Sequence, residues 1–234
     1  MSAARILNFE ERSLKMRRKL ITSVLVAATL FAATPLWAQA AAGANAGTGA
    51  KASSASTGAG AGAKELVVAD FNSGDKPNNI GGDFGTWDKD PNDETQSVQM
   101  AFEGDDAAGE ASGYSIRLDY DVDSPNPAYN GFWMKLNGED ATPYNAVNFY
   151  VRGDAEKPFT KRLKIELKDM SNQPSPYIIT GITNKWQKFT VPFEKFRKVK
   201  DWSAMNEFVV VFDDINSNPK VGTIYIDHVT FSKE

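Results

Sequence analysis

Apolar and aromatic residues alternate in the segment 129–136, whose sequence is YNGFWMKL. Successive side chains of a strand point to opposite faces, so Phe132 and Leu136 define a core face. The other face carries Tyr129 and Trp133, which is unusual for a surface that contacts only water. Rings on such a face offer a flat apolar platform on which a ligand can lie.

Two neighbouring segments carry polar groups on the face opposite their own apolar residues. In the segments 144–152 and 162–169 these outward groups are Asn148, Tyr150, Arg152, Glu166 and Lys168. We predict one sheet face that unites them with Tyr129 and Trp133, where Gly131 leaves a gap for a sugar ring. The apolar face of a pyranose packs on an aromatic ring, and its hydroxyl groups need donors and acceptors around it. The alternative is that these aromatic residues pack under loops or a second layer.

Groups that could carry out catalysis are few. The chain has one His, no Cys and no Gly-x-Ser-x-Gly motif, so no Ser–His or Cys–His pair is evident. We expect His228 to be structural, and zinc lacks enough nitrogen and sulfur ligands. Paired carboxylates for sugar hydrolysis stay open, because Asp and Glu are plentiful. The prediction is a protein that is not an enzyme.

Two further motifs are weak. The glycine-rich segment 79–87, NIGGDFGTW, matches no phosphate-binding motif, and we expect a loop that leads into Trp87. The segments that begin at Asp88 and Asp119 start like EF-hand loops but lack the required glycine and glutamate. An acidic loop such as DPNDE could still bind calcium.

The N-terminal segment has the parts of a secretory signal peptide. A basic stretch and an apolar run at 17–33 precede Ala-Gln-Ala at 38–40, which matches a cleavage site. We expect residues 1–40 to be removed, with Met1 or Met16 as the start, and the protein to be secreted or periplasmic. A membrane anchor is disfavoured because the apolar run is shorter than about 20 residues.

Charge and cysteine content restrict the partners. Residues 1–40 hold six basic and two acidic residues, so their removal lowers the formal net charge from −4 to −8. An acidic surface argues against nucleic acid and against anionic membranes as partners. Without cysteine, the exported protein must be stabilised by its core or by a bound ion, not by disulfides.

The rest of the chain divides into a linker and one domain. Residues 41–64 are nearly all Ala, Gly, Ser and Thr, so we expect a disordered linker. Residues 65–234 contain about ten short alternating segments separated by turn motifs, which predicts an all-β domain, an antiparallel β-sandwich. The segment 207–212, EFVVVF, is apolar on both faces and predicts a central strand that is covered on both sides. Only the segment 193–205 could hold a short helix.

Residues 65–234 resemble the family 11 carbohydrate-binding modules, which are galactose-binding-like jelly rolls. The resemblance rests on ADFNSG, IRLDYDV, YNGFWMKL, YNAVNFYVRG, LKIELKD, GITNKWQKFTVPFEKF and GTIYIDHVTF. It implies a non-catalytic domain that binds β-glucan, as polysaccharide or oligosaccharide, in a cleft on one sheet. The same scaffold serves the complex I intermediate-associated proteins, so the alternative is an assembly module that binds a protein partner.

The resemblance also implies further cleft residues. Tyr120 matches a cleft tyrosine, although its alternation with Leu118 points to the core. Asp201 and Trp202 match an acidic–aromatic pair that follows PFEKF. Phe212 stands where the family has a tyrosine, which leaves the identity of the sugar open.

A structural calcium ion is implied in the same way. These jelly rolls hold calcium between their first and last strands. Asp70 in ADFN and Asp227 in YIDHV are the positions that match. The resemblance therefore predicts calcium as the cofactor of the domain.

Overall fold

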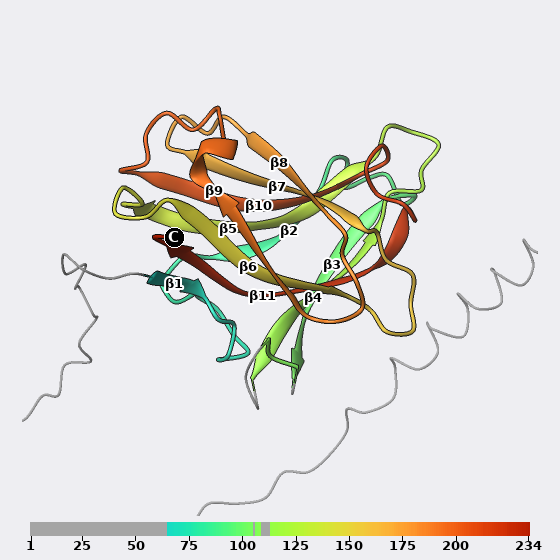
Figure 1. Cartoon of the computed structure of the whole chain (residues 1–234). Coiled ribbons are helices and arrows are strands. Elements are labelled where there is room, and N and C mark those ends of the chain that lie inside the picture. Colours follow the sequence, from blue (N-terminus) through green and yellow to red (C-terminus); the bar gives the residue numbers. More distant parts are fainter. Residues whose placement is uncertain (1–64, 105, 109–112) are drawn as a thin grey trace, which may run out of the picture. The chain divides into compact units, whose positions relative to one another are not determined.

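The computed structural model describes residues 65–104, 106–108 and 113–234. In this part of the chain, antiparallel strands form two sheets that pack face to face (Figure 1). The predicted signal peptide, 1–40, and the predicted linker, 41–64, lie outside the described residues. The strands, in chain order, are β1 (Glu65–Ala69), β2 (Phe84–Asp88), β3 (Ser97–Gly104), β4 (Tyr114–Asp121), β5 (Tyr129–Glu139), β6 (Ala146–Gly153), β7 (Arg162–Asp169), β8 (Ser175–Thr180), β9 (Gln187–Pro192), β10 (Met205–Asp213) and β11 (Val221–Ser232).

Strands that are distant in sequence are neighbours in both sheets. The first sheet has the order β3-β4-β11-β6-β9, and β1 also pairs with β11. The second sheet has the order β2-β5-β10-β7-β8. Connections that pass repeatedly between two antiparallel sheets are typical of a jelly roll. The prediction of an all-β antiparallel sandwich is confirmed.

The core lies between the two sheets and explains why the strands alternate. Phe132, Met134 and Leu136 of β5 are fully buried, as are Ile165 and Leu167 of β7. Burial of such a side chain contributes about 1.5–3 kcal/mol relative to exposure to water. Because neighbouring side chains point the other way, the outer face of each sheet is left for other contacts.

Two segments differ from the sequence-based expectation. The second half of the expected loop at 79–87 belongs to β2, which pairs with β5 and whose Phe84 is buried in the core. The segment 193–205 holds a single turn of 3-10 helix, η1 (Phe193–Lys195). The central position of β10 in its sheet is confirmed. Within the described residues, no helix has the length and apolar character needed to cross a membrane.

Candidate functional site

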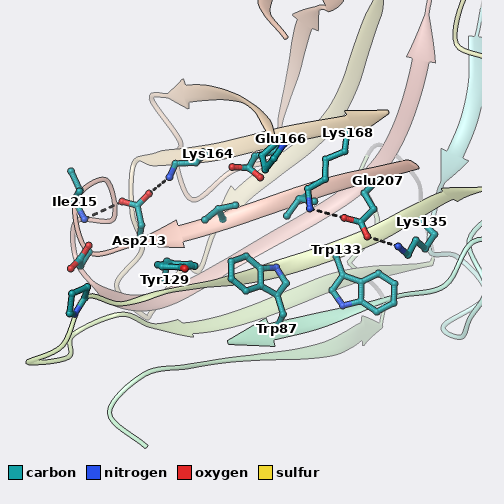
Figure 2. A pocket seen from close by; sticks show the side chains of 15 residues that line it. Trp87, Tyr129, Trp133, Lys135, Lys164, Glu166, Lys168, Glu207, Asp213 and Ile215 are labelled. Carbon is teal, nitrogen blue, oxygen red and sulfur yellow. Dashed lines mark hydrogen bonds and ion pairs between the residues drawn. The ribbon is translucent and has the colours of Figure 1, made fainter. Parts of the chain in front are cut away.

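A groove with a volume of about 820 Å³ lies on the outer face of the second sheet (Figure 2). Strands β2, β5, β10 and β7, with the loops at their ends, supply its side chains. The residues that line this groove are Trp87, Pro127, Tyr129, Trp133, Lys135, Lys164, Glu166, Lys168, Pro174, Glu207, Val209, Val211, Asp213, Asp214 and Ile215.

Strand pairing sets the cross-section of the groove. On the central strand β10, Val209 is directly opposite Trp133 of β5 on one side and Glu166 of β7 on the other. Val211 is likewise opposite Lys164 of β7. The two valines form an apolar floor. Trp87, Tyr129 and Trp133 form an aromatic wall beside it, and Lys164, Glu166 and Lys168 form a charged wall on the other side.

The aromatic wall is held against the sheet by two glycines. A Cβ atom at Gly85 would lie 3.3 Å from Cζ2 of Trp133, and one at Gly131 would lie 3.2 Å from Cζ2 of Trp87. Each indole therefore occupies the space over the glycine that faces it. The ring of Tyr129 continues the wall, with its centroid 5.8 Å from that of Trp87. The predicted gap at Gly131 is wrong, because the Trp87 indole fills it.

Ion pairs hold the lysines of the groove. Glu207 bridges two of them, with 2.5 Å to Nζ of Lys135 and 2.8 Å to Nζ of Lys168. The Asp213 carboxylate lies 2.5 Å from Nζ of Lys164. Burial alone would raise the pKa of Glu207, but the hydrogen bonds from its two lysines outweigh burial and lower it. Both carboxylates of these pairs are therefore held in the charged form.

Glu166 differs from the other charged residues of the groove. Among the described residues, none forms a hydrogen bond or ion pair with its half-buried carboxylate. Burial raises the pKa of Glu166 above its usual value, and the nearby Lys164 and Lys168 offset this only in part, through space. Figure 2 shows Glu166 between these two lysines, across the floor from the indoles. Glu166 thus presents free acceptor oxygens to anything that lies in the groove.

Three predicted site residues lie on the other sheet. Asn148, Tyr150 and Arg152 belong to β6, whose outer face points away from the groove. Asn148 is buried, and its amide donates to the Ser232 hydroxyl at 2.7 Å. The Arg152 guanidinium lies 3.6 Å from the centroid of the Tyr225 ring and also pairs with Asp106. The prediction that these residues share one face with Trp133 is wrong.

Tyr120 is a core residue. Only 2% of its surface is exposed, and its ring stacks on that of Phe212 with the centroids 4.2 Å apart. Its hydroxyl accepts the backbone N–H of Thr160 at 2.8 Å and donates to the carbonyl oxygen of Pro219 at 3.0 Å. Burial raises the pKa of Tyr120 well above its usual range. Tyr120 therefore does not line the groove, and the alternation with Leu118 predicted the correct face.

The pair Asp201 and Trp202 does not line the groove either. Trp202 stacks on Phe193 with ring centroids 4.0 Å apart, beside a separate hollow of about 420 Å³. The Asp201 carboxylate accepts the backbone N–H of Ser203 at 2.9 Å and stabilises its own loop. Of the predicted binding residues, the groove brings together Tyr129, Trp133, Glu166 and Lys168.

The residues predicted to hold calcium already have hydrogen-bond donors. Asp227 is buried and accepts the backbone N–H groups of Ala108 and His228. Asp70 accepts the backbone N–H of Asn72 at 3.1 Å. In the part of the chain that the structure describes, no three His, Cys, Asp or Glu side chains gather as a metal site. Calcium takes about six to eight oxygen ligands, so most would have to come from carbonyl, amide or water oxygens. Calcium stays a prediction.

Several groove residues were missed by sequence reasoning. Trp87 was assigned to a loop, although Phe84 and Thr86 alternate with Gly85 and Trp87 as in a strand. On β10, Glu207 and Asp213 stand at the two ends of the apolar run. Because the run is apolar on both faces, alternation does not indicate that these two side chains point to the outer face. The missed residues on β7 and β10 are Lys164, Glu207, Val209, Val211 and Asp213.

Comparison with known families supports a relationship over most of the domain. The family model described as carbohydrate binding domain 30 matches residues 78–233, which is more than half of the chain. Every residue that lines the groove lies within this match. Comparison with curated proteins gives no match.

Solved structures of other proteins share the fold. The family 11 carbohydrate-binding module of the cellulosomal cellulase Lic26A-Cel5E of Clostridium thermocellum is 15% identical, with a TM-score of 0.51, over 73% of this chain and 95% of that chain. A family 11 module from Clostridium thermocellum in complex with a beta-1,3-1,4-mixed-linked tetrasaccharide is 14% identical, with a TM-score of 0.51, over 72% and 95%. An exo-beta-agarase is 11% identical, with a TM-score of 0.54, over 72% of this chain and 25% of that chain. At such low identity these structures show the jelly-roll fold alone, and they confirm the fold that the resemblance implied.

Proposed function

The chain belongs to the carbohydrate binding domain 30 family, and we propose that it is a secreted, non-catalytic module that binds β-glucan in the groove. The observation that carries the proposal is the pairing of an aromatic wall with a free carboxylate across an apolar floor. Trp133 and Glu166 flank Val209 from the two adjacent strands. A pyranose between them can place its apolar face on the indole and its hydroxyl groups on the carboxylate.

The expected affinity follows from these contacts. Burial of roughly 50 Å² of apolar sugar surface on one ring contributes about 1 kcal/mol. The groove offers Trp87, Tyr129 and Trp133 together with hydrogen bonds to Glu166. Two or three rings plus these bonds correspond to about 5–8 kcal/mol, or roughly micromolar to sub-millimolar dissociation constants.

The length of the groove favours a chain over a single sugar. Glu207 and Asp213 stand at its two ends on β10, and a strand rises roughly 3.3 Å per residue, so the ends are roughly 20 Å apart. A ligand of this length contains several sugar units. The fold is shared with a solved family 11 module in complex with a mixed-linked tetrasaccharide, which supports a β-glucan as the first ligand to test.

The charges of the groove support binding without hydrolysis. Glycosidases use a pair of carboxyl groups, one as acid and the other as base or nucleophile. Glu207 and Asp213 are held in ion pairs with lysines, and at the end of the groove Asp214 accepts the backbone N–H of Ala128 at 3.5 Å. Glu166 is thus the one lining carboxylate that forms no hydrogen bond or ion pair with the described residues. No observation in the described residues favours the alternative of a protein-binding module.

The proposal includes calcium and export. Asp70 and Asp227 would hold a calcium ion that joins the ends of the domain, because β1 and β11 are paired. Cleavage of the signal peptide, residues 1–40, would leave a mature protein outside the cytoplasm that consists of the linker and the domain. Both parts of the proposal follow from the sequence and are tested separately from sugar binding.

Binding of a soluble mixed-linkage β-1,3-1,4-glucan to Trp133→Ala and Trp87→Ala tests the proposal. Each substitution removes one platform, so isothermal titration calorimetry should give at least about a fivefold to tenfold weaker affinity than the parent protein. Trp186→Ala is the matched control, because Trp186 is also half-buried but contacts Arg152 on the other sheet. Its glucan affinity should equal that of the parent.

Two results would contradict the proposal. One is that the parent protein binds neither the glucan nor its oligosaccharides at millimolar concentration. The other is that Trp186→Ala weakens binding as much as the groove variants do, which would place the site elsewhere. Reducing-sugar release from the same glucan checks the absence of hydrolysis, with a glucanase as the positive control.

A further inference from the structure

Every lysine that lines the groove has a carboxylate partner, but not every carboxylate that lines it has a lysine partner. Its three lysines each have a carboxylate partner: Lys135 and Lys168 contact Glu207, and Lys164 contacts Asp213. Glu166 forms no hydrogen bond or ion pair with any described residue. A ligand in the groove therefore meets no free lysine among the lining residues. It meets two carboxylates without a lysine partner: Glu166, and at the end of the groove Asp214, which accepts the backbone N–H of Ala128 at 3.5 Å.

This arrangement treats neutral and acidic sugars differently. The hydroxyl groups of a neutral glycan donate hydrogen bonds to Glu166. A carboxylate or sulfate on the glycan would be repelled by Glu166, and it would have to displace Glu207 or Asp213 to reach a lysine that lines the groove. We propose that Glu166 makes the groove select uncharged glycans over acidic glycans with the same backbone. This inference rests on the proposed function and names the ligand class of the same groove.

The position of Glu166 makes its charge effective. It lies on the middle of the charged wall, directly across β10 from Trp133, so a sugar on that indole lies one strand away from it. The side chain is half-buried, and partial burial reduces the screening of its field by water. Lys164, Lys168 and the exposed Lys198 act on it through space. Among the residues that line the groove, four carboxylates face three lysines, so the lining carries a formal net charge of −1.

Hydroxyethyl cellulose and carboxymethyl cellulose form a matched pair of probes. Both are soluble β-1,4-glucans with small substituents, and they differ in charge. The readout is the ratio of the two dissociation constants, measured at low ionic strength by affinity electrophoresis and calorimetry. We expect the parent protein to bind the neutral polymer about tenfold more tightly, the factor that corresponds to about 1.4 kcal/mol. Glu166→Gln, which keeps the shape and the acceptor oxygen, should bring this ratio to within about threefold of unity.

Two controls separate Glu166 from the net charge of the protein. Glu156→Gln removes the same charge from an exposed loop, and it should leave the ratio at the parent value. Glu166→Thr tests a different neutral side chain at the same position, and threonine favours strands. It should give the same ratio of dissociation constants as Glu166→Gln. Agreement between the two neutral variants would exclude a local folding defect as the cause.

The outcomes distinguish this inference from the proposed function. A parent protein that binds both polymers equally, or a Glu166→Gln ratio equal to that of the parent, would overturn the inference and leave glucan binding intact. A ratio that changes equally in Glu156→Gln would also overturn it, because net charge would then be the cause. Failure of the parent to bind either polymer or any mixed-linkage glucan would overturn the proposed function itself.

Discussion

Trp133 on β5 lies over Gly85 on β2, and Trp87 on β2 lies over Gly131 on β5. The indole of each strand therefore covers the backbone of the other strand at a glycine. Glycine weakens a strand interior, and an aromatic ring from the neighbouring strand restores the lost packing. For the groove, the consequence is that both platforms are held in place before a ligand arrives. Less side-chain entropy is then lost on binding.

The two glycines should respond differently to alanine. The three atoms nearest to a Cβ at Gly85 all belong to the Trp133 side chain, whereas a Cβ at Gly131 would lie 2.0 Å from the backbone oxygen of Val210. We expect Gly85→Ala to change the free energy of unfolding by less than about 1 kcal/mol while it weakens glucan binding, because the indole must tilt. Gly131→Ala should cost about 1–3 kcal/mol or more. Urea unfolding and calorimetry measure both effects, and equal stability losses would refute this distinction.

Tyr120 should matter for stability and not for the ligand. Tyr120→Phe removes a buried hydroxyl and leaves the backbone N–H of Thr160 and the carbonyl of Pro219 without this partner. The expected loss is about 1–3 kcal/mol in the free energy of unfolding, with unchanged glucan affinity. Tyr129→Phe is the matched control: this ring is 42% exposed, so its stability should change by less than about 0.5 kcal/mol. If Tyr120→Phe bound glucan more weakly and kept the full stability of the parent, Tyr120 would be a binding residue and this prediction would be wrong.

Asp169 should contribute a pH-dependent part of the stability. Hydrogen bonds from Ser171, Lys200 and Asp201 lower the pKa of Asp169 from 3.8 to about 2. Because the folded-state pKa lies below the unfolded one, this stabilisation is complete above about pH 4 and is lost as the pH falls through about 2. Asp169→Asn should therefore lower the stability above pH 4 and flatten its decline between pH 4 and 2. The measurement is urea unfolding at several pH values.

The control for Asp169 is an exposed carboxylate. Asp123→Asn removes the same charge from a side chain that is 69% exposed and whose ion pair with Lys220 is 3.9 Å long. Its stability should follow the parent curve within about 0.5 kcal/mol at every pH. Parallel curves for Asp169→Asn and the parent below pH 4 would show that Asp169 is not responsible for the decline.

Calcium should raise the thermal midpoint if Asp70 and Asp227 hold an ion. Binding to the folded state alone stabilises it by about 2.7 kcal/mol at 100 times the dissociation constant. Melting curves in calcium and in chelator measure the shift, and Asp227→Asn should abolish most of it. Asp123→Asn should keep the shift, since its carboxylate lies far in sequence from both positions. Identical midpoints with and without calcium in the parent protein would rule out the structural ion.

Local patterns predicted the strands well, because a strand and its buried face depend on neighbouring residues. The bounds of β7 were read directly from alternation, and Trp133 and Glu166 were assigned to the correct faces. Membership of a sheet depends on pairing between distant segments, which alternation does not encode. Arg152 was therefore placed beside Trp133, although β6 and β5 belong to different sheets. The paired charges of the groove were missed for the same reason, since each pair joins residues from different strands.

Separation of inner and outer faces also has an evolutionary consequence. On β5 and β7 the residues that fold the domain, such as Phe132 and Ile165, alternate with residues that line the groove, such as Trp133 and Glu166. An outward residue can therefore be exchanged while the buried pattern is kept. Proteins that share this scaffold can therefore differ on the outer faces of their sheets and still fold in the same way. An identity of 15% to a module with the same architecture is the kind of divergence that this freedom permits.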